Sequence, residues 1–203
     1  MLTLEHVTYT QAGFALSAHW ALEPEARVAI VGPSGAGKST LLALIGGFLA
    51  PSAGRILWQG KDITDAAPSA RPLANLFQEG NLFPHLTVFE NAALGVNTRL
   101  KLSAAETARV QGALERVGLA GFGARKPAQL SGGQASRAAL ARALCQDRPL
   151  LLLDEPFAEL DELTRQLAGD WVRDVAKLAN KTLLVVTHQA EDVTRVSDRC
   201  VHL

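Results

Sequence analysis

Cysteine is scarce in this sequence, and its scarcity limits what can hold the fold together. The 203 residues contain two cysteines, Cys145 and Cys200, which lie far apart and form no CxxC pair. We therefore expect neither a disulfide framework nor a cysteine metal site, and a reducing compartment is favoured.

The sequence also has no recognisable secretion signal and no long apolar run. Its first ten residues, MLTLEHVTYT, contain no basic segment followed by an apolar core, so no signal peptide is expected. No uninterrupted apolar stretch approaches the roughly 20 residues that a helix needs to cross a bilayer. The chain is therefore not expected to form a channel by itself.

An excess of charge of either sign is missing as well. Lysine plus arginine and aspartate plus glutamate each number 20, so the formal net charge is zero. This balance provides no overall basic field for nucleic acid, which we do not expect as a partner. With 48% hydrophobic and 20% charged residues, the composition is typical of a globular domain.

Apolar runs and helical stretches alternate along much of the chain. The run RVAIVG at 27–32 ends in glycine and is typical of a buried parallel strand. Such alternation, with polar residues at strand ends, predicts an α/β fold. Strands are expected at 2–9, 14–22, 27–32, 54–63 (as a hairpin or as edge strands), 73–78, 149–156 and 182–188, and helices at 38–49 and 161–179.

A helical, alanine-rich stretch from residue 81 to about 144 interrupts this alternation. Ser103 and Glu106 have capping-box spacing for a helix to about Val117, and Gly118 would end it. We interpret this stretch as an inserted helical lobe.

The segment GPSGAGKST carries the most specific local signal. It fits the pattern G-x-x-x-x-G-K-[ST], follows a predicted strand and opens a predicted helix, which a functionless glycine-rich turn would not require. Its glycines let backbone N–H groups face phosphate oxygens, Lys38 would bridge the β- and γ-phosphates, and Ser39 would hold Mg²⁺. The nucleotide-binding residues expected here are Gly32, Pro33, Ser34, Gly35, Ala36, Gly37, Lys38, Ser39 and Thr40.

Two acidic residues end the run LLLLDEP. Asp154 follows four leucines, where a carboxylate is costly without a cation, and Mg²⁺ on a nucleotide would supply one. Glu155 then stands where it can orient an attacking water or accept its proton. The alternative, an acidic pair that caps a helix, is weakened by the glycine loop.

The stretch LSGGQASRAALARAL combines a possible helix cap, Ser131, with two glycines before the helix proper. Gly132 and Gly133 cost chain entropy unless the backbone comes very close to another group. Because a helix N-terminus attracts anions, we interpret this segment as a phosphate contact. A capped alanine-rich helix with a glycine turn is the alternative.

These motifs resemble the ATP-binding subunits of ABC transporters in order and spacing, over nearly the whole chain. The glycine loop, Gln78, LSGGQ, LLLLDEP, AELD and His188 carry the resemblance. It implies that Tyr9 stacks on adenine, with Phe14 as the second choice. It further implies that Gln78 senses Mg²⁺ and water and couples to a membrane partner, and that His188 contacts the γ-phosphate. From the residues alone, none of these assignments stands out.

The resemblance also implies a dimer that forms when ATP binds. ATP on the glycine loop of one copy would lie under Ser131, Gly132, Gly133 and Gln134 of a second copy. Asp161, which ends AELD, is included among these contacts. The expected fold is a P-loop NTPase: a RecA-like core with a mainly parallel sheet, an N-terminal antiparallel β subdomain and an inserted helical subdomain at about 81–145. One ABC-type domain spans 1–203, with no C-terminal regulatory domain expected.

A closer resemblance is to the ATPase subunits of bacterial thiamine importers. It is carried by GPSGAGKSTLLALIGGFLAPSAG, RPLANLFQEGNLFPHLTVFENAALGVN and LKL. It implies two transmembrane permease subunits, a periplasmic binding protein and a peripheral location on the cytoplasmic face of the inner membrane. Residues 82–91 are the expected docking surface, although they could instead pack the helical lobe onto the core.

Several other functions remain open from the sequence. The substrate that the closer resemblance implies is thiamine or a thiamine phosphate. It could instead be iron, a polyamine or an oxyanion, since those importers share parts of these stretches. An exporter subunit, a soluble ABC ATPase of DNA repair or translation, and a nucleotide binder without hydrolysis are further alternatives. The sequence departs from the family pattern at Glu25-Ala26, at Ala135-Ser136 and at Ala158-Glu159, and the last departure puts the dimer contacts of that loop in doubt.

Overall fold

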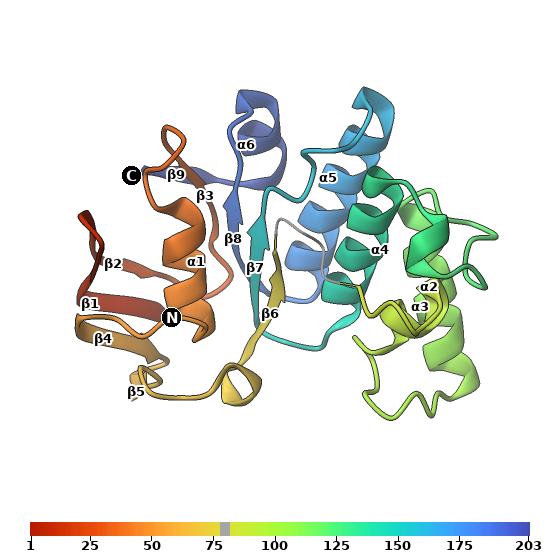
Figure 1. Ribbon diagram of the computed structural model, residues 1–203, viewed down its shortest axis with the longest axis horizontal. Coiled ribbons are helices and arrows are strands. Elements are labelled where there is room, and N and C mark those ends of the chain that lie inside the picture. Colours follow the sequence, from red (N-terminus) through yellow and green to blue (C-terminus); the bar gives the residue numbers. More distant parts are fainter. Residues whose placement is uncertain (78–81) are drawn as a thin grey trace.

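Two β-sheets of different construction organise the chain (Figure 1). The computed structural model describes residues 1–77 and 82–203. One sheet is entirely parallel, with the strand order β6-β7-β8-β3-β9. Its strands are β3 (Arg27–Val31), β6 (Leu73–Leu76), β7 (Leu150–Asp154), β8 (Thr182–Val186) and β9 (Arg199–His202).

The second sheet is antiparallel and is built mainly from the N-terminal segment. Its strand order is β2-β1-β4-β5. A two-residue turn at Ala12 and Gly13 joins its first two strands, so that Gln11 pairs with Phe14. The strands are β1 (Leu2–Gln11), β2 (Phe14–Leu22), β4 (Ala53–Trp58) and β5 (Lys61–Asp62).

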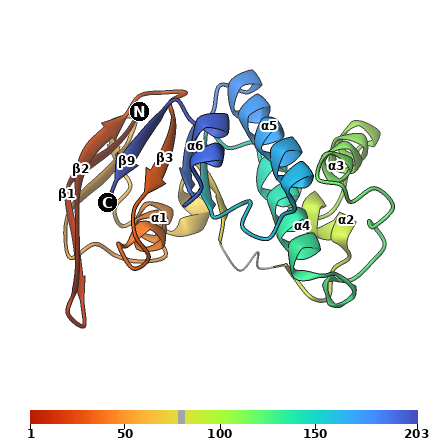
Figure 2. The same cartoon turned by 90° about the horizontal axis from the view of Figure 1, so that it is seen from above.

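The helices form layers on both faces of the parallel sheet. Figure 2 shows α1 on the side of the antiparallel sheet, α4 and α5 on the opposite side, and α2 and α3 beyond them. The helices are α1 (Lys38–Gly46), α2 (Val88–Ala93), α3 (Ala104–Arg116), α4 (Gly132–Cys145), α5 (Glu162–Leu178) and α6 (Ala190–Val196), with short 3₁₀ turns at Pro68–Ala70 and Pro127–Gln129.

Burial on both faces explains the leucine run of β7. Leu150 and Leu152 pack into the core shared with α1 and the antiparallel sheet. Leu151 and Leu153 pack into the core shared with α4 and α5. Because successive side chains of a strand point to opposite faces, a strand covered on both sides must be apolar throughout.

The predicted α/β P-loop fold is confirmed, with local differences in element bounds. The capping box of Ser103 and Glu106 is present at the start of α3. Helix α1 ends at Gly46, three residues earlier than expected, because Gly47 adopts a left-handed conformation and caps it. The short elements α6 and β9 were not expected. Among the described residues, none of the helices combines the length and apolar character needed to cross a membrane.

Candidate active site

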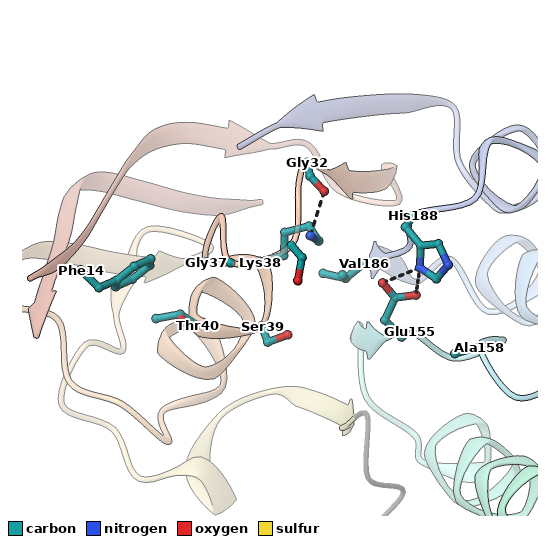
Figure 3. Close-up of a pocket in the computed structure, with 12 residues that line it drawn as sticks. Phe14, Gly32, Gly37, Lys38, Ser39, Thr40, Glu155, Ala158, Val186 and His188 are labelled. Carbon is teal, nitrogen blue, oxygen red and sulfur yellow. Dashed lines mark hydrogen bonds and ion pairs between the residues drawn. The ribbon is translucent and has the colours of Figure 1, made fainter. Parts of the chain in front are cut away.

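A cavity of about 530 Å³ opens at the carboxyl ends of β3, β7 and β8 (Figure 3). Parallel strands commonly present ligand sites at this edge of the sheet. Several sequence motifs that lie far apart in the chain meet here. The lining residues are Phe14, Gly32, Ser34, Gly35, Gly37, Lys38, Ser39, Thr40, Glu155, Ala158, Val186 and His188.

The glycine loop connects β3 to α1 and wraps one wall of the cavity. Gly35 and Gly37 have φ angles of +82° and +97°, which side chains other than glycine rarely adopt. The Lys38 ammonium donates hydrogen bonds to the carbonyl oxygens of Gly32, at 2.9 Å, and Pro33, at 2.8 Å. The loop therefore presents a cation and the N-terminus of α1 to the same space, as phosphate binding requires.

Asp154 ends β7 beneath this loop and is 5% exposed. Its Oδ1 atom is buried and has no hydrogen-bond partner among the described residues. Burial raises the pKa of Asp154, and the charge of Glu155 adds to this, whereas a hydrogen bond from Ser39 acts in the opposite direction. A buried carboxylate oxygen without a partner, beside a hydroxyl, is a donor set that suits a hard divalent cation.

Glu155 follows directly and turns its carboxylate toward His188. Its backbone is held at a φ of +48°, and its N–H donates to the carbonyl oxygen of Val186, at 3.0 Å. The Nδ1 atom of His188 lies 3.1 Å and 3.0 Å from the two carboxylate oxygens. The residues at the ends of β7 and β8 thus form an acid–imidazole pair at the cavity, as Figure 3 shows.

The aromatic residue at the cavity is Phe14, the second choice of the sequence analysis, and Tyr9 is not among the lining residues. A Cβ added to Gly37 would lie 2.7 Å from the Phe14 ring. Tyr9 shares a strand face with Phe14 but pairs with Leu16, farther from the turn, and its hydroxyl donates to Gln11. The rings of Tyr9 and Phe14 both pack against the core between α1 and the antiparallel sheet, and of the two only Phe14 also lines the cavity.

The LSGGQ segment forms the start of α4 and does not line this cavity. Ser131 caps the helix reciprocally with Gln134: the Ser131 hydroxyl accepts from the Gln134 N–H, and the Gln134 side chain accepts from the Ser131 N–H. The glycines have a close neighbour within the chain. A Cβ on Gly132 would lie 2.6 Å from Oε2 of Glu159, and a Cβ on Gly133 would lie 2.6 Å from the Glu159 carbonyl oxygen.

The remaining predicted residues take varied positions. Asp161 caps α5 by accepting hydrogen bonds from the N–H and hydroxyl of Thr164, and these bonds lower its pKa. Asp161 does not line the cavity. Pro33 and Ala36 belong to the glycine loop without lining the cavity. The expected role of Gln78 concerns a residue outside the described part of the chain.

Two lining residues, Ala158 and Val186, were not predicted from the sequence to be site residues. Ala158 belongs to the loop AELD that the sequence analysis did mark as a departure, whereas Val186 is one apolar strand residue among many. Its carbonyl oxygen accepts the Glu155 N–H, so its contribution is positional.

Several known proteins are similar in sequence to this chain. Three proteins named "Thiamine import ATP-binding protein ThiQ" are similar over nearly the whole chain. The protein of Cereibacter sphaeroides is 50% identical over 99% of this chain and 87% of its own length. Those of Jannaschia sp. and Yersinia pestis are 49% and 48% identical, over 100% and 98% of this chain and 89% and 84% of their own lengths.

Two solved structures of the cassette MJ0796 share the fold. One, described as a dimeric post-hydrolysis state bound to ADP and Pi, has a TM-score of 0.88. The other, described as the dimeric structure of a bacterial ABC transporter cassette, has a TM-score of 0.90. Each is 30% identical in sequence and covers 100% of this chain and 94% of its own.

The sequence profile of the family described as "ABC transporter" matches residues 16–158, which include the glycine loop, the start of α4, Asp154 and Glu155. Together with the identity to the relatives and the cavity geometry, this match establishes that the chain belongs to the ABC transporter family.

Proposed function

We propose that this chain is the ATP-hydrolysing subunit of a bacterial ABC importer and that the imported substrate is thiamine. The observation that carries the hydrolytic role is one cavity that is lined both by the phosphate loop and by the Glu155–His188 pair. The relatives named for thiamine import support the substrate, which this chain itself would never contact.

The residues at the cavity fit Mg²⁺. The unpartnered Oδ1 of Asp154 and the hydroxyl of Ser39 are oxygen ligands of the kind that Mg²⁺ accepts, and Gln78 is the third residue expected from the family pattern. Bound with the nucleotide, Mg²⁺ would neutralise negative charge on the phosphates.

Catalysis at this site consists mainly of positioning and electrostatic stabilisation. Glu155 orients a water molecule toward the terminal phosphate and accepts its proton. Lys38 and the backbone N–H groups of the glycine loop stabilise charge on the phosphate oxygens. His188 adds a further donor, and Phe14 offers its ring to the adenine base at the other end of the cavity.

The second nucleotide contact comes from another copy of the chain. The start of α4, at Ser131–Gln134, lies outside the cavity of its own chain and has the geometry of an anion site: a helix N-terminus of a 14-residue helix. The dimeric state described for both structural neighbours supports this arrangement. ATP would therefore join two copies, and hydrolysis would release them.

A groove of about 590 Å³ supports docking on the permease subunits. Phe48 and Phe83 are 49% and 46% exposed there, and Phe77 packs edge-on against Phe48. Exposed aromatic residues in a groove suit a short helix from a partner. Arg71 lies at the base, where its guanidinium binds the last carbonyl groups of α1.

Residues 82–91 were expected either to form a docking surface or to pack the helical lobe onto the core, and the stretch has residues of both kinds. Phe83 lines the groove, whereas Val88 is fully buried and Phe89 packs against the helical core. Docking through this groove would hold the chain on the cytoplasmic face of the inner membrane, beneath two permease subunits fed by a periplasmic binding protein.

Uptake of labelled thiamine tests the proposed substrate. Cells that lack this gene should lose uptake, and the wild-type chain should restore it. The Glu162→Gln variant should also restore uptake, because Glu162 is exposed and lies outside the cavity. Glu155→Gln should not restore it. If uptake is unchanged by loss of the gene, thiamine is rejected, and iron, polyamines and oxyanions are the substrates to assay in the same strains.

A further inference from the structure

The loop between β7 and α5 places a carboxylate on the first turns of α4. Oε2 of Glu159 lies 3.4 Å from the hydroxyl of Ser136. The same atom lies 2.6 Å from the position that a Cβ on Gly132 would occupy, and the Glu159 carbonyl oxygen lies 2.6 Å from the position that a Cβ on Gly133 would occupy. The two glycines thus make room for an anionic residue of their own chain.

The Glu159 carboxylate lies in an electrostatically favourable position, but few contacts hold its side chain there. The N-terminus of α4 carries partial positive charge, which attracts an anion. The Glu159 side chain is exposed, and within residues 1–77 and 82–203 its only hydrogen bond is the long one from Ser136, with no ion pair. A side chain held this way can rotate away from α4 at small cost.

We propose that Glu159 is an internal competitor for the phosphate groups that a second copy's nucleotide brings to the start of α4. The inference rests on the proposed function, in which that nucleotide is shared between two copies. A phosphate that approaches Gly132 and Gly133 meets a like charge beside the two glycines. Closure of the dimer therefore requires displacement of Glu159, and the residue sets the ATP concentration at which closure occurs.

Glu159 should affect closure of the dimer and not the binding of nucleotide by a single copy. Glu159 does not line the cavity of its own chain, although its neighbour Ala158 does. Removal of the charge should therefore leave ATP binding by the monomer unchanged and act only where two copies meet. Removal of one exposed charge at a helix end should change the equilibrium constant for dimer closure about two- to fivefold.

The test uses light scattering at increasing Mg-ATP on the Glu155→Gln chain, in which we expect the closed dimer to accumulate because hydrolysis is lost. We expect Glu159→Gln and Glu159→Ala, added to this chain, to lower the half-maximal ATP concentration for dimerisation about two- to fivefold. High salt should shrink the difference, because it screens exposed charges. Glu162→Gln, which removes a nearby exposed charge that contacts Gln166 instead, is the matched control and should change nothing.

The outcomes separate this inference from the proposed function. If the Glu155→Gln chain dimerises and both Glu159 variants need as much ATP as it does, or more, the competitor role is refuted and the proposed function stands. If the Glu155→Gln chain remains monomeric at saturating Mg-ATP, the shared-nucleotide dimer is refuted, and this inference with it. An equal shift in Glu162→Gln would assign the effect to net charge rather than to the Glu159 position, and would also refute the inference.

Discussion

The imidazole Nδ1 of His188 lies within 3.1 Å of both carboxylate oxygens of Glu155, so a single ring nitrogen contacts both oxygens of the acid that follows β7. His188 is 59% exposed at its side chain and Glu155 is 15% exposed. The imidazole therefore stands between solvent and the carboxylate, where it can orient the acid before nucleotide arrives and face the phosphates afterwards.

Loss of His188 should slow hydrolysis without preventing nucleotide binding. In His188→Ala we expect kcat to fall about 10²-fold, as for loss of one transition-state donor, because the phosphate loop still binds ATP. Steady-state phosphate release gives kcat, and titration with a fluorescent ATP analogue gives Kd. A raised Kd with unchanged kcat would contradict the assignment.

Phe14 should contribute more to nucleotide affinity than Tyr9. Base–aromatic stacking is worth about 1–3 kcal/mol, so Phe14→Ala should raise the Kd for ATP about tenfold, whereas Phe14→Trp should retain affinity. Tyr9→Ala should act mainly on thermal stability, since its ring packs against the core and, unlike Phe14, does not line the cavity. Calorimetric titration of the three variants decides between the two aromatics. The larger loss of affinity in Tyr9→Ala would reverse our assignment.

Asp154 should reduce the stability of the nucleotide-free chain at neutral pH. Burial raises its pKa, so the folded state favours the protonated form, and stability falls as pH rises through the raised pKa. Asp154→Asn removes that charge and should increase Tm at pH 7, with the advantage vanishing at pH below the ordinary aspartate pKa. The same variant should not hydrolyse ATP. Thermal unfolding across pH measures the effect, and a lower Tm at pH 7 would refute it.

The two glycines of α4 should differ in their tolerance of alanine. At Gly133 an added Cβ meets the backbone carbonyl of Glu159, so Gly133→Ala should destabilise the chain by about 1–3 kcal/mol. At Gly132 it meets only the end of the Glu159 side chain, which can rotate, so Gly132→Ala should lie within about 1 kcal/mol of wild type. Denaturant unfolding of the isolated chain compares them. Equal losses would show that the Glu159 backbone is not what Gly133 accommodates.

Features that depend on neighbouring residues in the chain could be predicted from the sequence. The phosphate loop was recognisable because its glycines, Lys38 and Ser39 are contiguous between a strand and a helix. The leucine run of β7 and the capping box at Ser103 are equally local, and both are present as predicted.

Features that depend on pairing between distant segments could not be predicted. Phe14 rather than Tyr9 reaches the cavity because the β1–β2 turn sets the register of the strands, which no local pattern specifies. The contact of Glu159 with Gly133 joins residues of different motifs, and only the packing of the β7–α5 loop on α4 brings them together. The two glycines of α4 therefore accommodate Glu159 of their own chain, which sequence spacing did not indicate.

The most direct test of the account is phosphate release from Mg-ATP by purified wild-type chain, Glu155→Gln and the Glu162→Gln control at equal concentrations. The account predicts steady release by wild type and Glu162→Gln, and release at least about 10²-fold slower by Glu155→Gln with ATP binding retained. Equal release by wild type and Glu155→Gln would show that this cavity does not carry the hydrolysis.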